Sequence, residues 1–143
     1  MNEAKHFVIV FGDPEQNGDP VESGRYTAGE GYKPFTVSPG DMLLLYCTEN
    51  YVAYSKQLAG IGIAIRVDTA LIEYRWFPFT TPVPREQVEQ AFEPDDREKM
   101  TQLRFNTRRV FMVSPKSFAN TVSGQALTWK RPQALNAAAA RKT

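Results

Sequence analysis

Three side chains able to recognise a flat, polar ligand follow an apolar segment in the first half of the chain. The segment Met42 to Leu45 leads into Tyr46, Thr48 and Asn50, which supply an aromatic ring, two hydroxyl groups and an amide. Aromatic rings stack on flat ligands, and hydroxyl and amide groups hydrogen-bond to their polar edges. A buried strand needs none of these groups at its end, so the cluster either caps the sheet or faces a ligand.

Tyrosine is concentrated in the same region of the sequence. Five of the six tyrosines lie between Tyr26 and Tyr54. Tyr26 and Tyr32 belong to a long segment, Glu15 to Pro39, that is rich in Gly, Pro, Asn and Asp, which predicts a loop or a loop with a short helix. Loops of this length are often functional, so these two tyrosines are candidate ligand contacts beside Tyr46. The alternative for Tyr46 is a core residue with a satisfied hydroxyl group.

Few residues are suited to catalysis or to metal binding. The chain has one histidine, His6, and one cysteine, Cys47, which argues against Ser/His/Asp, Cys/His and most zinc sites. We expect His6 to lie on the surface and Cys47 to pack as a small apolar side chain. Asp13 and Asp41 each adjoin a glycine, where an aspartate commonly bonds to its own backbone. We therefore expect no catalytic residue, no metal and no cofactor.

Charge is distributed unevenly along the chain. The formal net charge is +1, yet all 16 acidic residues precede position 101. The expected phosphate-binding residues come from the basic part that follows: Arg104, Arg108, Arg109 and Lys116. Clustered cations attract polyanions such as nucleic acids. The alternative is a basic tail with a few solvated strand residues.

Apolar runs and turn residues predict five strands and three short helices. The strands are expected at His6 to Phe11, Met42 to Cys47, Leu58 to Val67, Leu71 to Phe79 and Arg108 to Val113, with helices from Pro84, from Pro94 and from Pro115. Pro78 is expected to disrupt the ladder of the fourth strand, and the segment Thr80 to Pro84 to end it.

The third expected strand has two different faces. One face carries Ile61, Ile63, Ile65 and Val67, which predicts the core side, while the other carries Gly60, Gly62 and Ala64. Because glycines leave space beside a strand, a neighbouring helix is the expected occupant of the second face.

The totals predict one domain. A chain of 143 residues with 42% hydrophobic content fits a single core, and we expect a domain at residues 1–130 and a disordered basic tail at 131–143. Phe7 to Phe11 is far shorter than the roughly 20 residues that span a bilayer. We expect no membrane association and a cytoplasmic location. Strands without regular strand and helix alternation predict an α+β fold with a nearly closed mixed barrel; an OB-like barrel is the competing fold.

The order of the motifs resembles the EVE domain, a member of the PUA-like group that includes YTH and ASCH domains. The similar segments are "FVIVFGDP" (Phe7 to Pro14), "GDMLLLYCT" (Gly40 to Thr48), "AGIGIAIRV" (Ala59 to Val67) and "RRVFMVSPKSF" (Arg108 to Phe118). The resemblance covers most of residues 6–122. It implies a PUA-like, nearly closed barrel of five to six strands with short peripheral helices.

The resemblance also implies a function. EVE and YTH domains hold a base, often a modified one, in an aromatic pocket at the strand ends. The expected partner is therefore nucleic acid or a modified nucleotide, and the expected base-binding residues are Asp13, Tyr26, Tyr32, Tyr46, Thr48 and Asn50. Two alternatives stay open: a small hydrolase of the ASCH-like kind, using Asp13 or Asp41, and a domain that binds a small ligand or another protein.

Overall fold

The fold is described from a computed structural model. It describes residues 3–12, 20–27, 36–101, 110–123 and 125. Five of the expected site residues lie outside these ranges: Asp13, Tyr32, Arg104, Arg108 and Arg109. The same is true of the tail expected at 131–143, so its disorder stays a prediction.

One six-stranded mixed sheet forms the body of the protein, in the order β2-β5-β4-β3-β1-β6. The strands are β1 (His6–Phe11), β2 (Arg25–Thr27), β3 (Met42–Cys47), β4 (Gln57–Asp68), β5 (Leu71–Pro84) and β6 (Val110–Val113). The helices are η1 (Val21–Ser23), η2 (Val52–Tyr54), α2 (Arg85–Ala91), α3 (Pro94–Thr101) and α4 (Pro115–Ser123). β1 and β3 pair in parallel, and the other neighbouring strands pair antiparallel.

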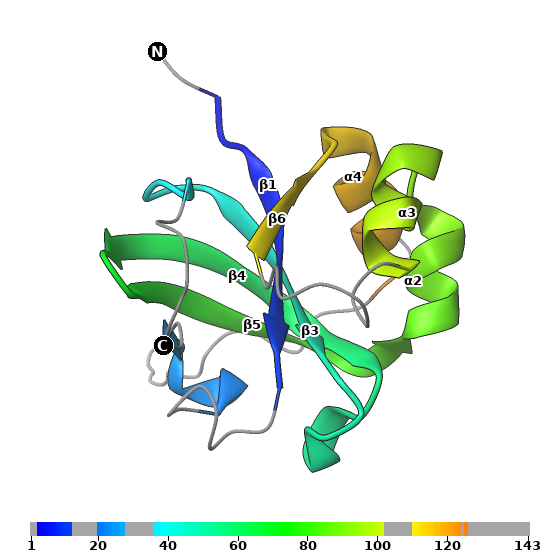
Figure 1. The fold of residues 1–143 in the computed structure, drawn as a ribbon, viewed down its shortest axis with the longest axis horizontal. Coiled ribbons are helices and arrows are strands. Elements are labelled where there is room, and N and C mark those ends of the chain that lie inside the picture. The colour runs from blue at the N-terminus through cyan, green and yellow to red at the C-terminus, as the bar shows by residue number, and fades with distance from the viewer. Residues whose placement is uncertain (1–2, 13–19, 28–35, 102–109, 124, 126–143) are drawn as a thin grey trace, which may run out of the picture.

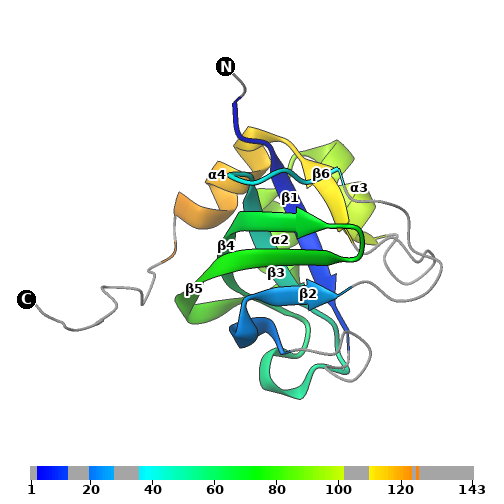
Figure 2. The same ribbon diagram turned by 90° about the vertical axis from the view of Figure 1, so that its left-hand side faces the viewer.

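The sheet curls into a partial barrel, and α2, α3 and α4 gather on one side of it (Figure 1). Seen from the other direction, β4 and β5 lie in front of β1 and β3 (Figure 2). Each face of the curled sheet has its own core. Along β3, Leu43, Leu45 and Cys47 join a first core inside the curl, whereas Leu44 and Tyr46 join a second core with residues of the helices. The expected α+β barrel with short peripheral helices is confirmed.

The expected strands and helices are present, with two differences. β5 continues beyond its expected end at Phe79 to Pro84, so that expected limit was wrong. The ladder with β4 is nevertheless irregular where Pro78 lies opposite Gly60, so the expected disruption of the ladder at Pro78 is confirmed. The three-residue strand β2 was not predicted. It follows the 3-10 helix η1 in the segment that was expected to be a loop or a loop with a short helix.

The expectation for the two faces of β4 holds only in part, because Ile61 is buried in the second core while the glycine face is buried as well. Ala64 lies in the first core with Tyr74, whereas Ile65 has 55% of its surface exposed. A methyl group added to Gly62 would lie 2.9 Å from the Tyr74 ring, and one added to Gly60 would collide with the backbone of β5. The space beside the glycines is therefore filled by β5 and not by a helix. Strict alternation fails at the register shift between Ala64 and Arg66, so Val67 packs against the first core with Ala64 and not on the face of Ile61.

No helix in the described part of the chain is long and apolar enough to cross a membrane.

Candidate ligand-binding site at the end of the barrel

The carboxyl ends of β1 and β3 meet at one end of the barrel. Phe11 is the register partner of Cys47, and the Thr48 backbone N–H donates to the Phe11 carbonyl oxygen at 2.9 Å. The turn that follows is held in place because the Tyr51 N–H donates to the Thr48 carbonyl oxygen at 3.0 Å. Parallel pairing thus places the segment 48–54 at the end of β1.

Tyrosine rings surround Phe11 at this end. The ring centroid of Phe11 lies 5.1 Å from that of Tyr26 and 6.4 Å from those of Tyr51 and Tyr74, all in edge-to-face geometry. Tyr54 extends the group, with its ring centroid 6.0 Å from that of Tyr51. Such pairs contribute about 0.5 to 1.5 kcal/mol each beyond the area that they bury. We call Phe11, Tyr26, Tyr51, Tyr54 and Tyr74 the tyrosine cluster.

The short helix η1 closes this end of the barrel. Its first residue, Val21, is fully buried, and two tyrosines hold its backbone: the Val21 N–H donates to the Tyr51 hydroxyl oxygen at 2.6 Å, and the Tyr74 hydroxyl donates to the Val21 carbonyl oxygen. Gly24 then turns the chain into β2 with a φ of 77°, a conformation that favours glycine. A side chain there would also meet the Tyr74 carbonyl oxygen at 2.8 Å.

Glu22 brings a carboxylate to the rim of the tyrosine cluster. The Tyr51 hydroxyl lies 3.5 Å from Glu22 Oε1, and the Tyr54 hydroxyl is also hydrogen-bonded to Glu22. Burial raises the pKa of Tyr51 to about 12, and the negative charge of Glu22 adds to this. Burial and Glu22 likewise raise the pKa of Tyr54, and they raise that of Cys47 to about 12. All three groups are thus neutral at physiological pH, and both phenols remain hydrogen-bond donors.

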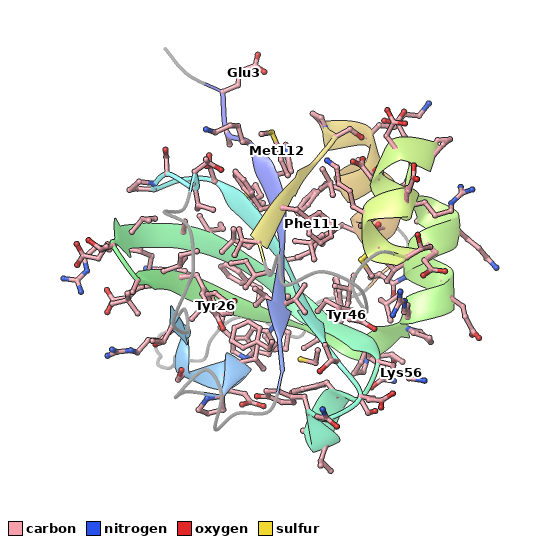
Figure 3. The ribbon with its side chains drawn as sticks, viewed as in Figure 1. Glu3, Tyr26, Tyr46, Lys56, Phe111 and Met112 are labelled. Carbon is pink, nitrogen blue, oxygen red and sulfur yellow. The ribbon has the colours of Figure 1, made fainter. Side chains whose placement is uncertain are left out.

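Tyr46 lies on the opposite face of the sheet from Tyr26. It is 1% exposed in the second core, on the side of the sheet that faces the helices (Figure 3). Its hydroxyl group accepts a hydrogen bond from Arg85. Burial raises the pKa of Tyr46, and the positive charge of Arg85 opposes the shift. This placement agrees with the alternative of a core tyrosine with a satisfied hydroxyl group. The expected pocket shared by Tyr46 and Tyr26 is therefore not formed. Side chains alternate along β3, so Tyr46 faces the helices, whereas Cys47 faces the first core, where Tyr26 lies.

The remaining described candidates are divided between the two ends of the barrel. Thr48 is partly buried and Asn50 is exposed, and both lie on the turn beside the tyrosine cluster. Lys116 is exposed on the first turn of α4. That helix begins just after Val113, the register partner of His6 at the opposite end of β1. Lys116 is therefore not brought together with Thr48 and Asn50.

The acidic and basic groups weighed for catalysis have structural partners. Asp41 is buried and accepts backbone N–H bonds from Lys5 at 2.9 Å and from Ser38 at 2.8 Å, so the expected backbone bonding is confirmed at Asp41. His6 was expected on the surface but is partly buried, with its ring centroid 4.7 Å from that of Phe118. Burial lowers its pKa, against the opposing charge of Asp41. Among the described residues, no three His, Cys, Asp or Glu side chains group as metal ligands.

Tyr51, Tyr54 and Glu22 were not selected from the sequence as site residues. The local excess of tyrosine pointed to the correct region, but the ends of β1 and β3 determine which rings meet. Cys47, and not Tyr46, is the last β3 residue on the inner face.

Comparisons with known proteins identify the fold. No protein-family model matches the sequence, and neither does any curated protein. Among solved structures, an ASCH protein from Zymomonas mobilis has 12% sequence identity and a TM-score of 0.57, over 87% of this chain and 98% of that one. The protein Rpa0253 from Rhodopseudomonas palustris has 17% identity and a TM-score of 0.57, over 80% and 88% of the two chains. Atu2648 from Agrobacterium tumefaciens has 16% identity and a TM-score of 0.56, over 82% and 90%.

The chain therefore has the PUA-like fold found in an ASCH protein. The expected fold is confirmed, and membership of the PUA-like superfamily and of its EVE branch stays a prediction.

Proposed function

We propose that this protein is a non-catalytic module that binds a nucleobase, in nucleic acid or as a modified nucleotide, at the tyrosine-lined end of the barrel. The observation that supports the proposal is the tyrosine cluster itself. It gathers three tyrosine rings around Phe11 and a fourth against Tyr51, where two parallel strands end, and two of the four hydroxyl groups meet Glu22. A PUA-like fold is consistent with this function but does not establish it.

The rim of the cluster offers the groups that a base requires. Tyr54 is the ring of the cluster that keeps some exposure, and it lies against the buried ring of Tyr51. Thr48 and Asn50 belong to the same turn and can meet the hydrogen-bonding edge of a base stacked on Tyr54. A base with a flat face on tyrosine and its edge toward these groups is the ligand that the rim fits best.

Two observations support a binding role over hydrolysis. Both carboxylate oxygens of Asp41 accept backbone N–H groups. The Cys47 thiol is buried, and its pKa of about 12 keeps it from acting as a thiolate. Asp13, the other acid considered, lies outside the described residues. A cytoplasmic location and phosphate contacts by Arg104, Arg108, Arg109 and Lys116 remain parts of the proposal.

The test is a fluorescence or calorimetric titration with short single- and double-stranded oligonucleotides that carry plain or modified bases, at low and moderate salt. We expect binding that weakens with salt and that Tyr54→Ala reduces about 5- to 100-fold, because stacking of one base contributes about 1 to 3 kcal/mol. Val52→Ala is the matched control, since Val52 lies in η2 with 90% exposure. Absence of binding at low salt, or equal binding by the Tyr54→Ala variant, would contradict the proposal.

A further inference from the structure

Glu22 lies at the rim of the tyrosine cluster and can accept further hydrogen bonds. It lies exposed on η1, whose neighbour Val21 is anchored by Tyr51 and Tyr74. The Tyr51 oxygen already accepts the Val21 N–H, so its proton is free to point at Glu22. Tyr54 donates a second hydroxyl group to the same carboxylate. A carboxylate has about four lone-pair positions, so two donors leave some of them open to solvent.

Among the described residues, Glu22 forms no ion pair with a lysine or an arginine. In the described ranges, the acidic residues with an ion pair to lysine or arginine are Glu49, Asp68, Glu73, Glu89 and Asp96. Glu22 is not among them, and within the described part of the chain its hydrogen-bonding partners include the two phenols. The nearby tyrosine rings present negative faces, which also favour a positive group.

This inference rests on the proposed function: we infer that Glu22 determines which base is bound. The preferred base has an edge that donates hydrogen bonds to Glu22, and a positively charged N-methylated base is bound most tightly. An ionised carboxylate only accepts hydrogen bonds. Glutamate and aspartate accept from the amino group of cytosine, which has two N–H donors. Uracil has a single N3–H donor between two carbonyl oxygens, whose lone pairs the carboxylate repels. A cationic base adds an ion pair with Glu22 and a cation–π contact with Tyr54.

The experiment compares three short single-stranded oligonucleotides that differ in one central base: uracil, cytosine or the cationic 3-methylcytosine. For the wild-type protein we expect the affinity to rise about 5- to 10-fold from uracil to cytosine, and again from cytosine to 3-methylcytosine. In Glu22→Gln the three affinities should converge to within about twofold, because an amide both donates and accepts. Glu86→Gln, which removes one exposed charge on α2, should retain the wild-type order.

The outcomes separate this inference from the proposed function. Equal binding of the three oligonucleotides by the wild-type protein, or an unchanged order in Glu22→Gln, overturns the inference and leaves the binding function intact. Binding of none of them at low salt overturns both. Circular dichroism checks that each variant is folded. If Glu22→Gln does not fold, Glu22→Asp replaces it: the shorter carboxylate should preserve the order and weaken 3-methylcytosine most, and equal weakening of all three would contradict the inference.

Discussion

The hydroxyl oxygen of Tyr51 accepts a hydrogen bond of 2.6 Å from the backbone N–H of Val21, which lies 30 residues earlier in the chain. The bond joins η1 to the turn after β3 and closes the end of the barrel. Because Val21 is fully buried, water cannot replace Tyr51 as the acceptor. The shape of the candidate site therefore depends on this contact.

Replacing Tyr51 with phenylalanine should destabilise the protein by about 1 to 3 kcal/mol, the usual cost of leaving a buried donor unsatisfied. Urea unfolding monitored by circular dichroism measures the effect. Tyr54→Phe is the matched control. It removes a hydroxyl group that bonds to the exposed Glu22, and it should cost less than about 1 kcal/mol. Equal unfolding midpoints for Tyr51→Phe and the wild-type protein would show that the contact does not hold η1.

Tyr46→Ala should cost about 3 to 5 kcal/mol, because it opens a cavity in the second core. Tyr46→Phe keeps the ring and loses only the bond from Arg85, so it should cost about 1 to 3 kcal/mol and leave oligonucleotide affinity unchanged. Thermal unfolding and titration of both variants test this. If the Tyr46→Phe protein is folded but no longer binds the base, Tyr46 belongs to the binding site.

Asp96 should make stability depend on acid pH. Burial alone would raise its pKa, but the Ser114 backbone N–H at 2.9 Å, the Ser117 hydroxyl at 2.7 Å and the charge of Lys99 hold the pKa below its usual value. Ionised Asp96 therefore stabilises the fold above the unfolded-state pKa of about 3.9, and this contribution is lost as pH falls through the lower folded-state pKa.

The measurement is urea unfolding at pH 7 and at pH 3. Asp96→Asn should lower the free energy of unfolding at pH 7 and show a smaller loss between the two values than the wild-type protein. Asp95→Asn is the control, because Asp95 is its exposed neighbour in the same helical turn. An Asp96→Asn protein with the full wild-type acid dependence would exclude this role.

Two glycines in β4 should differ in their tolerance of alanine. The added methyl group at Gly60 would meet the backbone of β5, including Pro78 Cα at 2.7 Å, whereas at Gly62 it would meet the Tyr74 side chain at 2.9 Å. Because a side chain can move more easily than paired backbone, Gly60→Ala should cost about 3 kcal/mol and Gly62→Ala about 1 kcal/mol. Thermal denaturation ranks them, and the reverse order would contradict the packing described for β5.

The elements of the fold were largely readable from local patterns. Apolar runs bounded by turn residues located β1 and β3 at their observed limits, and proline at the helix starts located α2, α3 and α4. β2 was missed because three residues carry no periodicity. Its pairing with β5 is a long-range contact.

The candidate site was only partly predictable. Tyr26 was selected and lies in the tyrosine cluster, and Thr48 and Asn50 lie on the turn beside it. Tyr46 was also selected, but it faces the helices and Arg85. Strand alternation separates Tyr46 from Cys47 but does not say which of them faces the interior of the curl.

The sequence by itself determined the types and order of the strands and helices, because these follow from periodicity, turn residues and helix caps over a few neighbouring residues. It also determined that tyrosines and polar groups gather around the end of β3. Only the tertiary structure decided which tyrosines meet, because the parallel pairing of β1 with β3 and the return of η1 beneath them bring Phe11, Val21 and Tyr51 together. Such contacts depend on the curl of the whole sheet, and no local pattern in the chain specifies them.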